Sequence, residues 1–93
     1  MAYRVVDPYK RLDAWSNAEP RKDTRQAVHR WLADVLAQDP DAVDGTPIPG
    51  NFDLQAWIAV VPGTDILVEW AVLKAPPLPR HLECIAIISI GAT

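Results

Sequence analysis

Residues 52–74, FDLQAWIAVVPGTDILVEWAVLK, decide the fold of this chain. Two β-prone runs, residues 52–61 and 65–74, flank Pro62-Gly63-Thr64, which is typical of a tight turn. Glycine adopts positive φ there without a steric penalty, so the segment predicts an antiparallel β-hairpin.

Further strands are expected on both sides of this hairpin. Residues 81–90 predict a last strand, because its four isoleucines favour the pleated backbone. Residues 75–79, APPLP, predict a stiff extended connection to it. Residues 3–6 are short and β-prone and predict a first strand.

Two helices are expected between the first strand and the hairpin. Asp7-Pro8 is typical of a helix start, because the Asp7 carboxylate accepts N–H groups of the first turn and proline loses no hydrogen bond there. This first helix should end near Ser16-Asn17, and Asn17 would cap the second.

The second helix carries the strongest periodic signal. Its apolar residues recur at spacings of three and four, which predicts an amphipathic helix of about twenty residues. They are Ala27, Val28, Trp31, Leu32, Val35 and Leu36. The helix must end before Asp39-Pro40, and the proline- and glycine-rich residues 39–51 predict a loop.

The order β-α-α-β-β-β predicts a two-layer α+β domain over residues 1–93, with the N-terminal strand and two helices packed on an antiparallel sheet. Strand alternation assigns the residues to two faces. The helix-covered face would carry Leu54, Ala56, Ile58, Val60, Ile66, Val68, Trp70, Val72, Leu82, Cys84, Ala86, Ile88 and Ile90. The open face would carry Gln55, Trp57, Ala59, Val61, Leu67, Glu69, Ala71, Leu73, Glu83, Ile85, Ile87 and Ser89.

Length and composition restrict the function classes. The chain has 93 residues and 49% hydrophobic residues, enough for one small core. Its net charge of −3 argues against non-specific phosphate binding. The single cysteine, Cys84, excludes an internal disulfide and a cysteine-based zinc site. No signal-peptide pattern and no membrane-length apolar run is visible, so we expect a cytoplasmic protein without membrane contact.

The charge is unevenly distributed. Residues 1–38 carry seven basic and five acidic side chains, whereas residues 39–93 carry two basic and seven acidic ones. The sheet half is therefore acidic, and the helical half is mildly basic. Lys22, Arg25 and His29 share one flank of the second helix, either as a solvated edge or as a contact for an acidic partner.

The order of elements, the helix end LAQDP at residues 36–40 and the hairpin AVVPGTD at residues 59–65 resemble the RelE/ParE toxin superfamily of bacterial toxin–antitoxin systems. The opening YRV at residues 3–5 and GTPIPG at residues 45–50 also fit. The resemblance covers nearly the whole chain and implies a compact cytoplasmic toxin that an antitoxin protein neutralises. In this superfamily RelE-type members cut mRNA on the ribosome, and ParE-type members block DNA gyrase.

The chain departs from the nuclease pattern of that family. Trp57 and Trp70 stand where the middle strands of such nucleases carry arginines, and the last strand is followed by no Arg, His or Tyr. Glu69 and Glu83 would repel RNA on the open face, where cleavage needs cations. The resemblance therefore assigns no catalytic residue to this chain, and we expect no direct nucleic-acid binding.

The sequence thus favours a toxin-like component of a type II module that acts by protein binding, as a gyrase-type inhibitor or a catalytically impaired toxin held by an antitoxin. One alternative is a ribosome-dependent mRNA endonuclease with an atypical site, for which Lys74, Arg80 and His81 are weak candidates. Another is a small non-enzymatic interaction or regulatory domain. Homodimerisation stays open.

The open face carries several large apolar groups, so either a partner or a second copy binds it, or a loop or the N-terminal segment of this chain covers it. The candidate partner-binding residues combine this face with the basic flank of the second helix. They are Trp57, Leu67, Glu69, Lys22, Arg25 and His29. Trp57 has the best claim, because interfaces are enriched in tryptophan. Nothing in the sequence requires a metal or a cofactor, since no further ligand type is spaced near His29 or His81.

The remaining chemical groups have structural interpretations. Cys84 is expected to pack in the core, and Trp31 and Trp70 are expected to pack between the layers. Glu69 and Glu83 would form an acid–base pair only if their strands lie in register, and we favour two surface acids.

Overall fold

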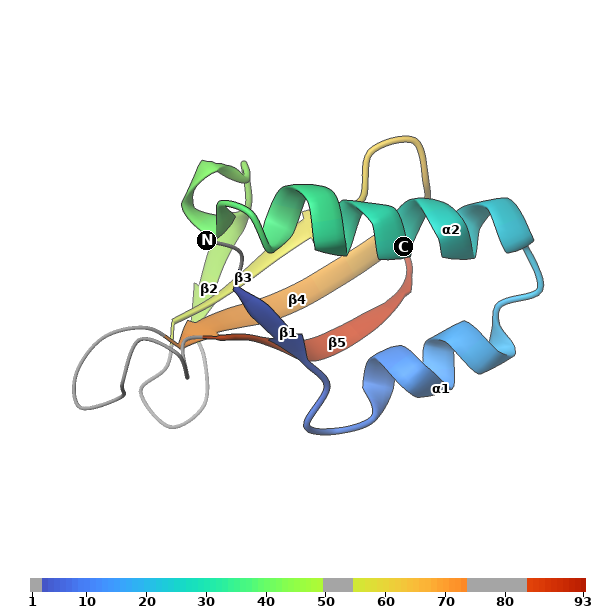
Figure 1. The fold of residues 1–93 in the computed structure, drawn as a ribbon, viewed down its shortest axis with the longest axis horizontal. Helices are drawn as coiled ribbons and strands as arrows, with labels where there is room; N and C mark the ends of the chain where they lie inside the picture. Colours follow the sequence, from blue (N-terminus) through green and yellow to red (C-terminus); the bar gives the residue numbers. More distant parts are fainter. Residues whose placement is uncertain (1–2, 50–54, 74–83) are drawn as a thin grey trace.

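The structure is a computed structural model that describes residues 3–49, 55–73 and 84–93. Within these ranges two helices pack on a five-stranded mixed sheet in an α+β fold (Figure 1). The elements are β1 (Arg4–Val6), α1 (Arg11–Ala18), α2 (Lys22–Trp31), a π-helical segment (Leu32–Leu36), a 3-10 turn (Pro40–Ala42), β2 (Thr46–Pro49), β3 (Gln55–Val60), β4 (Ile66–Leu73) and β5 (Cys84–Ala92).

The strand order is β1-β5-β4-β3-β2, and β1 pairs in parallel with β5 while the other neighbours are antiparallel. The predicted elements occur in the predicted order, but the sheet is mixed rather than wholly antiparallel. Strand β2 lies where a loop was predicted. Its Pro47 and Pro49 lack an N–H group and are tolerated because β2 is an edge strand.

The start of α1 is fixed by Asp7 from outside the helix. The two oxygens of its carboxylate accept the N–H groups of Leu12 at 3.1 Å and Asp13 at 2.9 Å. Lys10 immediately before the helix is in the left-handed region at φ 57°. The predicted capping by Asp7 is confirmed, but α1 begins at Arg11 and its last turn includes Asn17, which therefore caps no second helix.

The second helix widens at its end. The N–H group of Ala37 donates to the carbonyl of Leu32 at 2.9 Å, the five-residue step of a π-helix. The widening turns Val35 outward, so that this predicted core residue is 47% exposed, while Leu36 is fully buried. The carbonyl of Ala37 accepts the N–H group of Tyr3 at 2.7 Å, which ties this end to the chain just before β1.

The hairpin between β3 and β4 contains four residues between its last pair, not the predicted three. The N–H group of Val61 donates to the carbonyl of Ile66 at 2.9 Å, so residues 62–65 form the loop. Gly63 has φ 78°, as its turn position requires. The Thr64 hydroxyl donates to the Val61 carbonyl at 2.9 Å and stabilises the loop.

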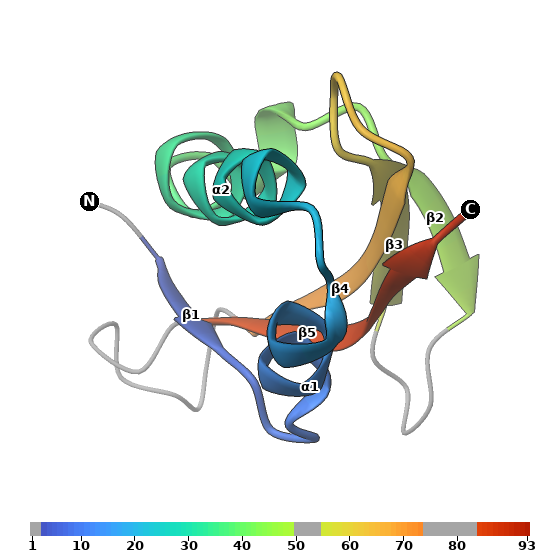
Figure 2. The same cartoon turned by 90° about the vertical axis from the view of Figure 1, so that its right-hand side faces the viewer.

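The core lies between α2 and the sheet, which curls around this helix (Figure 2). Trp31 of α2 and Trp70 of β4 meet edge to face with ring centroids 6.0 Å apart. Gly45 lies over Trp70, where an added Cβ would be 2.9 Å from a ring carbon. Leu12 and Trp15 of α1 pack against the same core, and α1 lies beside β5.

Candidate protein-binding face

The pairing of the strands defines the sheet face that points away from α2, here called the outer face. Glu69 pairs with Ile58 on one side and with Ser89 on the other. Leu67 pairs with Val60 in the neighbouring row. Because paired residues point to the same side of a sheet, these five side chains lie together on the outer face.

Exposure varies along the outer face. A row of small residues, Ala56, Ala71 and Ala86, is buried, with exposed fractions of 2%, 2% and 7%. Towards the β3–β4 loop the face opens, and Val60 is 46% exposed while Leu67 is half-buried. The accessible part is therefore apolar and adjoins the half-buried Glu69.

Glu69 is the charge at the centre of this region. The Ser89 hydroxyl donates to one of its carboxylate oxygens at 3.4 Å. Among the described strands, the outer face carries one cation, Arg4 of β1, and β5 lies between β1 and the strand of Glu69. The described strands thus carry one acid and one cation on the outer face, and Glu83, the second acid expected there, lies outside the described residues.

Trp57 does not lie on the outer face. It pairs with Trp70 and packs against the core on the inner face, the side that faces α2. The prediction was wrong because of the length of the hairpin loop. With a three-residue loop, odd-numbered residues of β3 would pair with odd-numbered residues of β4. The four-residue loop pairs them with even-numbered residues, which moves Trp57 to the face of Trp70. Ile58 and Val60, predicted to face the helices, lie on the outer face instead.

A β-bulge reverses the assignment within the last strand. Before it Glu69 pairs with Ser89, and after it Trp70 pairs with Ile87, so one residue of β5 is skipped. Ile85 and Ile87 were predicted on the open face but are fully buried in the core. Cys84 lies on the outer side, not on the predicted inner face, although it is buried as expected.

The basic flank of α2 is largely engaged with α1 and the segment that follows it. The Arg25 guanidinium donates to the carbonyl of Glu19. The His29 ring is 3.2 Å from the Ser16 hydroxyl and packs against Trp15 with centroids 6.3 Å apart. Arg25 and His29 thus contact α1 and the residue that follows it, a structural role that the sequence did not indicate.

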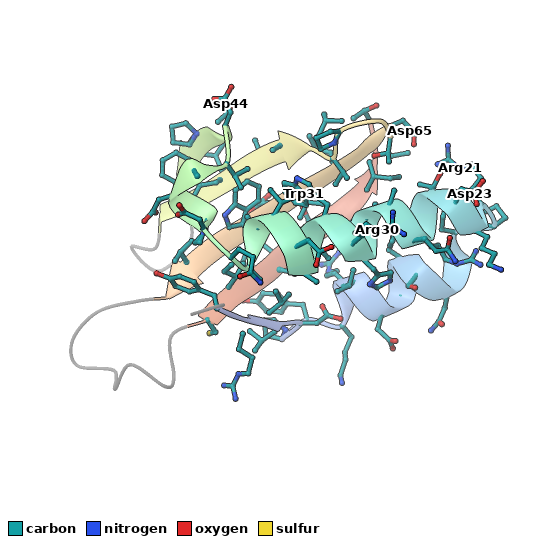
Figure 3. The ribbon with its side chains drawn as sticks, turned by 45° about the horizontal axis from the view of Figure 1, so that its top comes forward. Arg21, Asp23, Arg30, Trp31, Asp44 and Asp65 are labelled. Atoms are coloured by element: carbon teal, nitrogen blue, oxygen red, sulfur yellow. The ribbon has the colours of Figure 1, made fainter. Side chains whose placement is uncertain are left out.

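An ion cluster joins the start of α2 to the β3–β4 loop (Figure 3). The Arg21 guanidinium contacts Glu19 at 2.7 Å and Asp65 at 2.9 Å. Hydrogen bonds from the Arg21 side chain and backbone lower the pKa of Glu19 to about 2, and the two carboxylates raise the pKa of Arg21. No local sequence pattern indicates this cluster, because Arg21 and Asp65 are 44 residues apart.

Several predicted groups cannot be placed on this framework. Lys74, Arg80, His81 and Glu83, with the connection at residues 75–79, lie outside the described residues. The described part of the chain has no group of three or more His, Cys, Asp or Glu side chains that could hold a metal ion. No described helix is long and apolar enough to cross a membrane.

Searches of protein-family models, of curated proteins and of solved structures found no match to this chain.

Proposed function

We propose that this protein is a toxin-like component of a bacterial type II toxin–antitoxin module, acting in the cytoplasm by binding a protein. One observation carries the proposal: the outer face of β3 and β4 presents Ile58, Val60 and Leu67 around Glu69, without a cation among the described residues of these strands. Val60 is 46% exposed, its neighbours Ile58 and Leu67 are partly exposed, and a contiguous accessible apolar surface often marks a protein interaction site.

Binding is favoured over RNA cleavage on electrostatic grounds. Cleavage of a phosphodiester needs positive groups that offset the charge developing on the phosphate. Glu69 at the centre of the outer face would repel that phosphate. Trp57 lies on the inner face and could not contact an RNA strand on the outer face. The antitoxin, and either DNA gyrase or the ribosome, are the partners that this proposal implies.

The order of the helices and strands also supports the proposal. A first strand, two helices, a β-hairpin and a last strand follow one another in the order on which the family resemblance rests. The family resemblance indicates the class of partner, and the chemistry of the outer face indicates that the protein acts by binding.

Inducible expression of the full chain in a bacterial host tests the proposal. The expected result is growth arrest with intact transcripts, and accumulating DNA damage would point to gyrase. Leu67→Glu should abolish the arrest, because it places a second carboxylate on the exposed part of the outer face. Val35→Glu is the matched control, since Val35 is 47% exposed on the opposite layer.

Cleaved transcripts would overturn the binding mechanism in favour of a nuclease. Normal growth would overturn the toxin assignment and leave a non-enzymatic interaction domain. Arrest that survives Leu67→Glu, in a variant whose thermal unfolding matches wild type, would show that the outer face is not the binding surface.

A further inference from the structure

Glu69 restricts which partner can cover the outer face. Its carboxylate has two acceptor oxygens, and the Ser89 hydroxyl reaches one of them at 3.4 Å. Covering a carboxylate with apolar groups alone removes water without replacing its hydrogen bonds, which is unfavourable. A partner that buries Val60, Leu67 and Glu69 therefore has to bring hydrogen-bond donors to the Glu69 carboxylate, and a cationic donor also compensates its charge.

A second copy of this chain does not meet that requirement in a contact centred on Glu69. In a two-fold dimer the same patch lies on both subunits, so a contact centred on Glu69 brings two carboxylates together. The described strands of this face supply one cation, Arg4, and β5 separates its strand from β4. The surface is thus complementary to a different, basic partner.

Addition of a partner's β-strand to the free edge of β2 is also unfavourable. Pro47 and Pro49 remove two N–H groups from this outermost strand, which weakens the template for an added strand. Docking across the face avoids this edge. Residues two apart on a strand are about 6.6 Å apart, close to the roughly 5.4 Å rise of one helical turn.

We propose that the outer face binds an amphipathic helix of another protein, in which an Arg or Lys pairs with Glu69 and apolar residues one turn away pack on Val60 and Leu67. Arginine is the better donor, because its guanidinium can bond both carboxylate oxygens. This inference rests on the proposed protein-binding function and specifies the chemistry of the partner.

Two synthetic amphipathic helices of about 15 residues, identical except for a central Arg or a central Glu between leucines, test the inference by fluorescence anisotropy. Wild-type protein should bind the Arg peptide about tenfold more tightly or better than the Glu peptide, as expected of a charge-assisted hydrogen bond. Glu69→Gln should remove this preference, and Glu69→Lys should reverse it.

Asp34→Lys is the matched control, because it changes the net charge equally at an exposed site on the helical layer. It should leave the preference unchanged. Equal binding of both peptides, no binding at about 1 mM, or an unchanged preference in Glu69→Lys would each overturn the inference. A wild-type dimer in sedimentation velocity that Leu67→Glu dissociates would also overturn it, by placing a second copy on the face.

The two proposals fail separately. Charge-selective peptide binding without growth arrest would keep the docking surface and reject the toxin assignment. Growth arrest that depends on Leu67, combined with no charge selectivity at Glu69, would keep the proposed function and reject the basic helix as the partner.

Discussion

The two faces of the sheet are similar in composition but different in environment. On the inner face Val68, Trp70 and Ile87 are at most 1% exposed beneath α2. On the outer face Ile58 and Leu67 are half-buried and Val60 is 46% exposed. Apolar residues thus stabilise the fold on the inner face, and near the β3–β4 loop they form an accessible surface on the outer face.

The difference shows why apolar content alone does not locate a core. Both faces are rich in aliphatic residues, but Trp57 and Trp70 lie on the inner face and Glu69 lies on the outer face. None of the buried residues in the described part of the chain is polar or charged. A half-buried carboxylate is tolerated where water or a partner can reach it.

The largest effect is expected from the inner face. Trp70→Ala should lower the free energy of unfolding by about 3–5 kcal/mol, because it removes the edge-to-face contact with Trp31 and leaves a cavity below Gly45. Urea denaturation measures the change. Ile58→Ala on the outer face is the control and should cost less, and equal losses would mean that both faces are buried.

The end of the second helix allows a second comparison between a buried and an exposed residue. Leu36→Ala should cost about 2–5 kcal/mol, because Leu36 is fully buried. Val35→Ala should change stability by less than about 0.5 kcal/mol, because the π-helical segment turns Val35 outward. Thermal unfolding of both variants decides the matter, and the reverse order would require a regular α-helix through residue 36.

Helix α1 packs against the core through Leu12 and Trp15, and the Asp7 carboxylate accepts hydrogen bonds from its first turn. Asp7→Ala should cost about 0.5–2 kcal/mol at pH 7, as loss of a helix cap does. Burial raises the pKa of Asp7, but the N–H groups of residues 11–13 and the charge of Lys10 outweigh it, so that the pKa lies below its usual 3.8.

The sign of the pH effect follows from that direction. A carboxylate with a lowered pKa in the folded state stabilises the fold above its unfolded pKa, and this contribution disappears as the pH falls through the folded value. Stability curves of wild type and Asp7→Ala should therefore converge in acid. A constant difference down to about pH 2 would contradict the role of the charged form.

The smallest effect is expected at the ion cluster that links α2 to the β3–β4 loop, in which the side chains of Arg21 and Asp65 are about half exposed and that of Glu19 is 9% exposed. Arg21→Gln should lower the melting temperature slightly, and added salt should reduce the difference, because exposed ion pairs are screened. The pKa of Glu19 is about 2, so its contribution should be lost between its ordinary value of 4.5 and that pH. Calorimetry at low and high salt measures this, and Lys22→Gln is the control.

Part of the candidate site was accessible from the sequence. The outer-face positions of Leu67 and Glu69 are confirmed, because the β4 alternation was correct. Their role in binding a partner stays a prediction. Ile58 and Val60 were missed and Trp57 was misplaced, since one residue more in the loop exchanges the faces of β3.

The sequence by itself determined β1, the two helices, β3, β4, β5 and their order, because local sterics and periodicity act within a few residues. The glycine of the hairpin turn, the capping carboxylate of Asp7 and the apolar stripe of α2 are such local signals. Only the tertiary structure decided which side chains face solvent. The loop length, the bulge between Glu69 and Trp70 and the π-helical turn each shift the register by one residue, and pairing and packing with distant strands select them.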